Sequence, residues 1–150
     1  MEKLVIRKSI EIKAPKEVVW DVMLLDKFTR QWYSAFSEGS YAESDWTLGS
    51  KARFLDQSGQ GMVGKIVAND PSRIISIEYE GVINNNVDDY DSEAAKAVKG
   101  GMETYRLIEK DGITTLFIES DMTEELYEML SVLWDQALLK VKELAEEFKN

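Results

Sequence analysis

The N-terminal part of the chain changes from an alternating pattern to a helical one. Between residues 3 and 13 apolar and polar side chains alternate, with Lys8 as the exception, which predicts a strand with one buried face. From Pro15 the apolar positions follow helical spacing through "KEVVWDVMLL", and proline is favourable where a helix opens. A second short helix is expected over "DKFTRQWYSAF", with Asp26 as its cap.

The middle of the chain consists of short β-like segments separated by turn residues. They are "SYAES", "SKARFLD", "GQGMVGKIVAND" and "RIISIEYEG". Glycines 59, 61 and 64 indicate a turn, a bulge or a close backbone approach. The clearest hairpin is "METYRLIEKDGITTLFIES", with its turn at Lys110-Asp111-Gly112. Strands joined by short turns predict an antiparallel sheet.

Residues 82–99 interrupt this β pattern and read as an insertion. Its second half, "SEAAKAVKGG", predicts two helical turns, with Asp91 or Ser92 as the cap and Gly100 as the stop. Long loops of this kind are often lids, binding loops or disordered segments. The acidic run in this segment lacks the spacing and the glycine of an EF-hand loop, so we expect a solvated loop and no metal site.

The C-terminal segment "LYEMLSVLWDQALLKVKELAEEF" predicts one long helix, with Asp121 or Thr123 as its cap. A heptad seam runs through Tyr127, Leu130, Trp134, Ala137, Val141, Leu144 and Phe148. Leu126, Leu133, Leu138 and Ala145 widen it into a stripe, which is typical of a helix that packs into its own domain. The antiparallel sheet needs a cover for its apolar face. We therefore expect a monomer, with a homodimer seam as the alternative.

Together these elements predict an α+β fold and a single domain over residues 1–150. The chain contains no histidine and no cysteine. Histidine-dependent triads, cysteine nucleophiles and ordinary zinc sites are thereby excluded. We expect no cofactor, no metal and no catalytic residue identifiable by motif, and any acid–base chemistry would need Asp, Glu, Lys or Tyr.

The net charge of −10 narrows the classes of partner that we expect for this protein. Phosphate backbones and anionic membrane surfaces would be repelled, so neither a nucleic acid nor a membrane is an expected partner. No apolar run approaches the roughly 18 residues of a spanning helix, and the first 15 residues alternate, unlike a signal peptide. We therefore expect a cytoplasmic protein.

The order of elements and several local stretches resemble a known superfamily. A strand, two short helices, about six strands and a long helix resemble the START-like helix-grip (SRPBCC) order. Within it, "IKAPKEVVWDVM", "QWY", "GMVGKIVANDPSRIISIEYEG", "GITTLFI" and "WDQALLKVKEL" resemble the branch similar to the activator of heat-shock protein 90 ATPase. "LGSKARF" resembles a further stretch of that branch, with Ser50 in place of the usual second glycine. The resemblance covers nearly the whole chain.

This resemblance implies a curved antiparallel sheet of about six to seven strands, with the long C-terminal helix packed across its concave face. It also implies a cavity between the two, which in the superfamily often holds a lipid, sterol, hormone or polyketide. Our leading hypothesis is non-enzymatic binding of a hydrophobic or amphipathic small molecule, lipid-like or polyketide-like. The alternatives are a protein-interaction or co-chaperone role with a protein client, and a cyclase- or hydratase-type enzyme. The enzyme hypothesis predicts a carboxylate or tyrosine with a strongly shifted pKa in the cavity.

Aromatic side chains supply most of the candidates for the cavity wall, because such pockets combine apolar walls with a few polar anchors. The candidate cavity residues are Trp32, Trp46, Phe54, Met62, Tyr79, Tyr105, Arg106, Phe117, Tyr127, Leu130 and Trp134. The same aromatics also suit core packing. Arg106 or Arg53 could anchor a ligand carboxylate if it lies on the concave face, and is a solvated cation if it lies on the outer face.

Overall fold

The computed structural model describes residues 3–148 and contains eight strands, four α-helices and one short 3-10 helix, η1. The elements in chain order are β1 (Lys3–Ile12), α1 (Lys16–Leu24), α2 (Asp26–Trp32), η1 (Tyr33–Ala35), β2 (Tyr41–Glu43), β3 (Lys51–Leu55), β4 (Gly61–Asp70), β5 (Ile74–Asn84), β6 (Val87–Asp89), α3 (Glu93–Val98), β7 (Met102–Lys110), β8 (Ile113–Thr123) and α4 (Glu124–Phe148). None of the helices in this described part of the chain is long and apolar enough to span a membrane.

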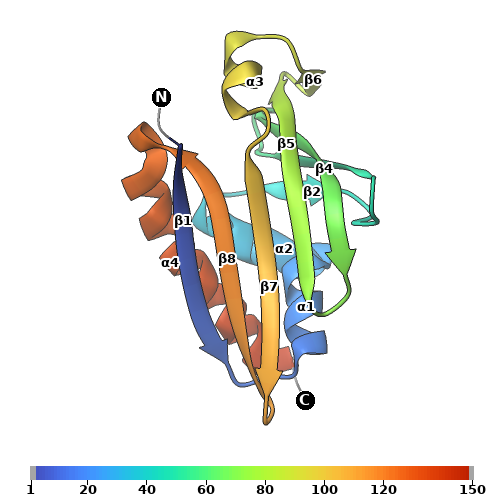
Figure 1. The fold of residues 1–150 in the computed structure, drawn as a ribbon, viewed down its shortest axis with the longest axis vertical. Coiled ribbons are helices and arrows are strands. Elements are labelled where there is room, and N and C mark those ends of the chain that lie inside the picture. The colour runs from blue at the N-terminus through green and yellow to red at the C-terminus, as the bar shows by residue number, and fades with distance from the viewer. Residues whose placement is uncertain (1–2, 149–150) are drawn as a thin grey trace.

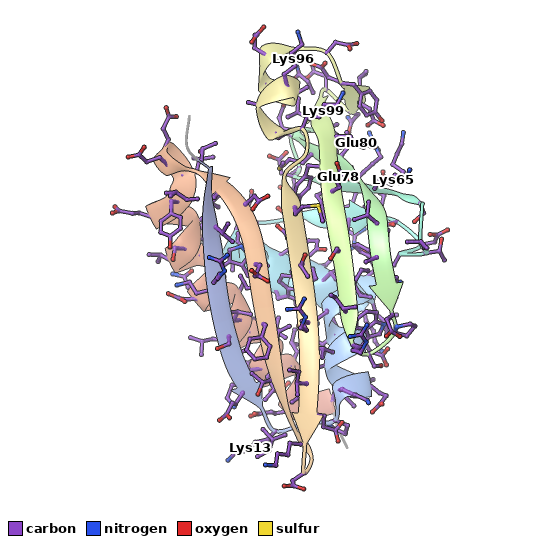
Figure 2. All side chains as sticks on the ribbon, viewed as in Figure 1. Lys13, Lys65, Glu78, Glu80, Lys96 and Lys99 are labelled. Atoms are coloured by element: carbon purple, nitrogen blue, oxygen red, sulfur yellow. The ribbon has the colours of Figure 1, made fainter. Side chains whose placement is uncertain are left out.

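The strands form one antiparallel sheet in the order β1-β8-β7-β5-β4-β3-β2, and β6 adds to β5 beside this path. Helices α1, α2 and α4 lie together on one side of the sheet, and α3 with β6 stands at one end (Figure 1). The opposite side of the sheet faces solvent, and Lys65 and Glu78, paired across β4 and β5, project from it (Figure 2). The predicted architecture is confirmed, and β6 is the strand that the sequence pattern did not predict.

Helix α4 finds its partner within the chain. Its buried residues share one core with inward-facing side chains of β1, β5, β7 and β8, and with α1 and α2. They are Trp134, Ala137, Leu138, Val141, Leu144 and Ala145. None of them precedes Trp134, whereas Leu126, near the start of the helix, is 43% exposed. The stripe therefore covers the sheet through its C-terminal half and leaves its N-terminal half thinly packed.

Helix capping differs from the prediction at α2 and agrees with it at α3. Asp26 is the first residue of α2 and the cap position is Leu25, so the predicted Asp26 cap is wrong. The Asp26 carboxylate pairs instead with Arg30, one turn later, at 2.8 Å. At α3 the Ser92 hydroxyl accepts a hydrogen bond from the Ala95 N–H, which confirms Ser92 as the cap. Gly100 follows α3 with φ of +85°, a left-handed conformation that favours glycine.

The β pattern continues further into residues 82–99 than expected. Strand β5 extends to Asn84, and Asn85 and Asn86 then adopt φ of +52° and +66°. Two successive residues with positive φ form the tight turn that matches strand twist, and asparagine tolerates this conformation. The chain therefore returns as β6 and pairs with β5 before α3 begins. The segment is a short hairpin followed by a helix, which corrects the prediction of a β-breaking loop.

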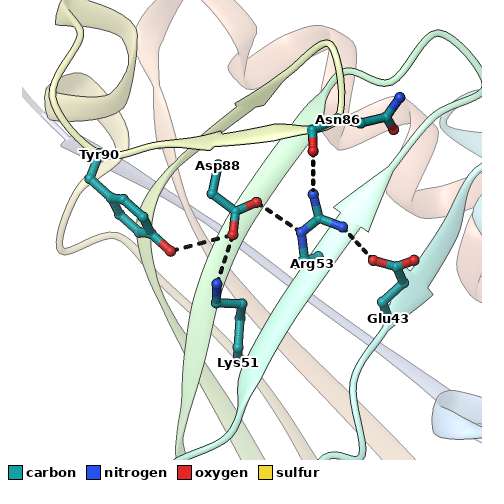
Figure 3. Close-up of polar contacts among 6 residues, drawn as sticks. All are labelled: Glu43, Lys51, Arg53, Asn86, Asp88 and Tyr90. Carbon is teal, nitrogen blue, oxygen red and sulfur yellow. Dashed lines mark hydrogen bonds and ion pairs between the residues drawn. The ribbon is translucent and has the colours of Figure 1, made fainter.

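Arg53 fixes β6 against the outer face of the sheet (Figure 3). Its guanidinium donates to Asp88 at 2.8 Å, to Glu43 at 2.5 Å and to the Asn86 carbonyl oxygen at 3.0 Å. Lys51 donates to the second Asp88 oxygen at 2.8 Å. Burial alone would raise the pKa of Asp88, but these two cations outweigh it and hold the pKa below its usual range. Arg53 therefore has a structural role, which corrects its candidacy as a ligand anchor.

Replacing Arg53 with alanine should lower the free energy of unfolding by about 1 to 2 kcal/mol at pH 7, because it leaves the partly buried Asp88 carboxylate with one cation fewer. Urea unfolding followed by circular dichroism measures this change. Arg73→Ala is the matched control, since Arg73 pairs with Asp70 on an exposed surface, and it should change stability by less than about 0.5 kcal/mol.

The effect of Arg53→Ala should depend on pH in a defined direction. A carboxyl with a lowered folded-state pKa contributes stability above its unfolded pKa of about 3.9 and loses it as the pH falls through the folded value. The difference between wild type and Arg53→Ala should therefore shrink in acid below about pH 4. A difference that stays constant from pH 7 to pH 3 would contradict this account.

The three glycines of the β3–β4 hairpin each meet one of the predicted requirements. Gly59 lies in the turn with φ of +83°, and Gly64 flanks a register shift between β4 and β5. Gly61 pairs with Leu55, and a Cβ atom at this position would lie 1.8 Å from the carbonyl oxygen of Phe54. The backbones of β3 and β4 thus approach each other so closely at Gly61 that no side chain fits there.

Candidate functional site

A cavity of about 590 Å³ lies between the N-terminal half of α4 and the concave face of the sheet. Its walls come from α2 and η1, from the β2–β3–β4 region, from the inner faces of β5, β7 and β8, and from α3 and α4. The thin packing of the first turns of α4 leaves this volume open, since the buried residues of the helix begin only at Trp134. The size is within the range of small-molecule sites.

The exposure of the lining residues shows which end of the cavity is open. Trp32, Tyr105, Ser120 and Trp134 are buried and form its inner end. Ser37, Gln60, Ala97 and Leu126 are exposed and lie at its mouth. Ala97 belongs to α3, so the inserted helix forms part of the rim. It is held there by backbone hydrogen bonds from Gly100 to Tyr79 and from Tyr79 to Gly101.

Aromatic rings in mutual contact make up most of the inner wall. Trp134 lies 4.9 Å from Phe36 and 6.0 Å from both Trp32 and Tyr105, measured between ring centroids. Phe54 lies 6.0 Å from Tyr79 and 6.4 Å from Tyr33. The Trp32 indole N–H donates to the Val22 carbonyl oxygen at 3.0 Å, which fixes this ring against α1. The wall is therefore apolar, rich in π faces and held in place by packing.

At the inner end of the cavity, the carboxyl group of Glu103 interrupts this apolar wall. Glu103 lies on β7 and shares its inner face with Tyr105 and Leu107. It accepts hydrogen bonds from the hydroxyls of Tyr105 and Ser120, the latter at 3.2 Å, and from Tyr79. Three strands thus each contribute a hydroxyl donor to one carboxyl group: β5, β7 and β8.

Burial decides the ionisation of this cluster. Removal from water raises the pKa of Glu103 above its ordinary value, although the hydrogen bonds from Tyr105, Tyr79 and Ser120 favour the charged form and oppose this effect. Burial, together with the nearby Glu103 charge, raises the pKa values of Tyr79, Tyr105 and Tyr33 well above the usual value for tyrosine. The tyrosines therefore remain protonated donors across the physiological range, and Glu103 is the group of this cluster that titrates.

The stability of the protein should report this titration through the variant Glu103→Gln. A carboxyl with a raised folded-state pKa contributes most below its unfolded pKa of about 4.3 and loses that contribution as the pH rises through the folded value. The free energy of unfolding of wild type relative to Glu103→Gln should therefore fall between about pH 4 and pH 8. Urea titrations of both proteins across this range measure it, and a pH-independent difference would contradict the raised pKa.

The structure brings seven of the eleven candidate residues together in the cavity wall. They are Trp32, Phe54, Met62, Tyr79, Tyr105, Leu130 and Trp134. Trp46 lies behind Phe54, with ring centroids 6.0 Å apart, and donates its indole N–H to the Leu24 carbonyl oxygen at 3.1 Å. Tyr127 packs partly buried against the core beside the cavity. These two residues support the wall from outside.

Arg106 and Phe117 do not lie on the concave face, which corrects their prediction as cavity residues. They face each other across β7 and β8 on the outer side, where both are exposed. Arg106 lies 4.0 Å from Glu119, and Arg7 pairs with the same carboxylate at 3.1 Å. The buried neighbours Tyr105, Leu107, Leu116 and Ile118 occupy the inward positions, and alternation turns Arg106 and Phe117 outward.

Three lining residues of consequence were absent from the candidate set: Phe36, Glu103 and Ser120. Two of them could have been found by alternation. Glu103 precedes Tyr105 and Leu107 by even steps, and Ser120 follows Leu116 and Ile118 in the same way. A polar residue on an apolar strand face is the signal of a buried polar group.

Comparison with known proteins gives structural matches only. No protein-family model matches the sequence, and no curated protein matches it. The solution structure of the Aha1 dimer from Colwellia psychrerythraea is 17% identical, covers 98% of this chain and 99% of that chain, and has a TM-score of 0.73. DynU16, a protein in the dynemicin biosynthetic locus, is 13% identical, with 97% and 48% covered and a TM-score of 0.70. CalU16 from Micromonospora echinospora is 18% identical, with 96% and 85% covered and a TM-score of 0.64.

Identities this low show a shared fold and leave the activity open. The match to the Aha1 structure extends over almost the full length of both chains. The chain therefore has the helix-grip fold of these proteins, with a cavity at the position where the long helix crosses the sheet.

Proposed function

We propose that this protein binds a hydrophobic or amphipathic small molecule in the cavity between α4 and the sheet. The observation that carries the proposal is the cavity itself: about 590 Å³, walled by aromatic rings, with one cluster of polar groups at Glu103. Apolar walls supply affinity, and a few convergent polar groups orient the ligand. The fold shared with DynU16 from a biosynthetic locus is compatible with such a ligand.

A neutral fluorescent probe tests this proposal. N-phenyl-1-naphthylamine should bind saturably, with one site per chain, and its emission should rise as it leaves water. Leu130→Trp places additional bulk in the cavity from α4 and should abolish binding. Leu139→Trp, on the exposed side of the same helix, is the matched control and should leave binding intact. Absence of saturable binding, or equal binding by the two variants, would reject the cavity as a site.

Acid–base catalysis is a second candidate function, and Glu103 is the observation that favours it. A carboxyl group with a raised pKa in a cavity is what a cyclase- or hydratase-type enzyme needs for proton transfer. Mass spectrometry of small molecules copurified with wild type and with Glu103→Gln tests it. An enzyme should carry product in the wild type and accumulate unconverted substrate in the variant. The same molecule in both proteins would favour binding alone.

The protein-interaction alternative rests on the fold shared with Aha1. Fold alone does not determine function, so a protein client stays a prediction, to be tested by pull-down from the native host.

A further inference from the structure

All of the charged side chains of residues 3–148 that line the cavity are acidic. Three of its lining residues are acidic, Glu103 at the inner end and Asp56 and Asp121 elsewhere in the wall, and no lysine or arginine within residues 3–148 lines it. Asp56 accepts from the Ser58 N–H at 2.8 Å, and Asp121 accepts from the Met102 N–H at 2.9 Å. The Ser58 contact orients the Asp56 carboxylate without adding a positive charge.

The two arginines considered as anchors for an anionic ligand do not line the cavity. Arg53 is held by Asp88 and Glu43, and Arg106 lies on the outer face with Glu119. Arg30 packs over the Tyr41 ring at 4.9 Å and pairs with Asp26. A carboxylate or phosphate group in the cavity would therefore lie near the carboxyl groups of Glu103 and Asp56. No lysine or arginine of residues 3–148 lines the cavity to offset that repulsion, and this disfavours fatty acids and other anionic amphiphiles.

The same wall suits a positive charge in two ways. Glu103 supplies a carboxylate already oriented by three hydroxyl donors, and a cation beside it would neutralise a charge that is otherwise costly to bury. The rings of Tyr79, Tyr105 and Trp134 line the same cavity, with Trp134 6.0 Å from Tyr105, and π faces attract organic cations most strongly where water is excluded. A carboxylate within an aromatic wall is the environment in which an ammonium group is stabilised.

We propose that the ligand of this cavity is an amphipathic organic cation, an apolar body carrying a protonated amine or a quaternary ammonium that lies between Glu103 and the surrounding aromatic rings. This inference rests on the proposed binding function and specifies its ligand class. The apolar body fills the space toward Met62 and Leu130, and the cationic group lies at the inner end.

Calorimetric titration with three molecules of equal chain length tests the ligand class: decylammonium, decan-1-ol and decanoate, each below its micelle concentration at pH 7. Decylammonium should bind about tenfold more tightly than decan-1-ol, and decanoate should bind most weakly. Decyltrimethylammonium is a further arm, because it retains the charge and cannot donate a hydrogen bond. Tighter binding of either cation than of decan-1-ol supports the inference.

Variants of matched charge locate the effect. Glu103→Gln should remove the preference for decylammonium, measured as the ratio of the affinities for decylammonium and decan-1-ol. Glu78→Gln removes the same charge from the outer face (Figure 2) and should leave all affinities unchanged. Equal affinities for cation and alcohol in wild type, tighter binding of decanoate, or a preference that survives Glu103→Gln would overturn the inference. If none of the four molecules binds, the proposed binding function fails instead.

Proton release gives a second test that uses the wild-type protein alone. The groups that interact with Glu103 are Tyr79 from β5, Tyr105 from β7, Tyr33 from η1 and Ser120 from β8, and Trp134 of α4, which lines the same cavity, is uncharged. The tyrosines stay protonated, so a bound cation selects ionised Glu103 and releases its proton. Decylammonium affinity should rise between pH 5 and pH 8 while that of decan-1-ol stays constant. Heats that do not depend on the ionisation enthalpy of the buffer, together with a flat pH profile, would exclude Glu103 as the partner.

Discussion

Replacing Trp134 with alanine should lower the free energy of unfolding by about 3 to 5 kcal/mol. Trp134 is only 4% exposed and contacts the rings of Trp32, Phe36 and Tyr105, so its removal leaves a void that joins the ligand cavity. The surrounding residues belong to three separate elements and cannot all collapse into that void. Urea unfolding followed by far-UV circular dichroism measures the loss, since a tryptophan fluorescence signal would itself change with this substitution.

Leu139→Ala is the control for this prediction. Leu139 lies on the same helix but is 62% exposed, so its truncation should cost less than about 1 kcal/mol. Both variants change an apolar residue of α4 to alanine, so the difference between their unfolding free energies isolates the effect of burial. Similar costs for the two substitutions would show that α4 is not held to the sheet through Trp134.

Gly61→Ala should destabilise the protein by about 3 kcal/mol through overpacking. The added methyl group would lie 1.8 Å from the Phe54 carbonyl oxygen, and backbone atoms of two paired strands cannot move apart without breaking their hydrogen bonds. Because Phe54 lines the cavity, the substitution should also weaken binding of the neutral probe. Thermal and urea unfolding measure the loss of stability, and titration with the neutral probe measures the loss of binding.

Gly112→Ala provides a comparison, because its expected destabilisation has a different physical cause from that of Gly61→Ala. Gly112 lies in the β7–β8 turn with φ of +80°, and a Cβ atom there would meet nothing within 4 Å. The expected cost is the conformational strain alone, about 1 to 2 kcal/mol. If Gly61→Ala costs no more than Gly112→Ala, the close approach of β3 and β4 is not rigid.

Periodicity predicted the fold well because it reports which face of an element is buried. The β7–β8 hairpin, the α4 stripe and the role of Trp134 within the core all follow from spacing. The same rule, applied residue by residue, would have turned Arg106 and Phe117 outward and Glu103 inward. Residue type alone, aromatic or basic, therefore misplaces side chains that the alternation of a strand places correctly.

Other features depend on contacts between distant segments and could not be predicted from local sequence. Strand β6 forms because the Asn85-Asn86 turn returns the chain to β5 and because Arg53, more than 30 residues earlier, binds Asp88. The cavity lies beside the part of α4 before Trp134, where no side chain of the helix is fully buried. Glu103 departs from the alternation of its strand, because it places a carboxyl group on an otherwise apolar face. Such departures are concentrated at functional sites.

The uneven packing of α4 has a consequence for local unfolding. The half of the helix from Trp134 onward is tied to the core, so its amide protons should exchange with solvent only when the whole domain unfolds. The half before Trp134 stands over the cavity and can open while the sheet stays intact. The first turns of α4 would then be the part of the helix through which a ligand enters and leaves the cavity. Ligand binding would slow the exchange of amide protons in these turns. The long helix thus combines a C-terminal part that we expect to unfold only with the whole domain and an N-terminal part that we expect to open locally.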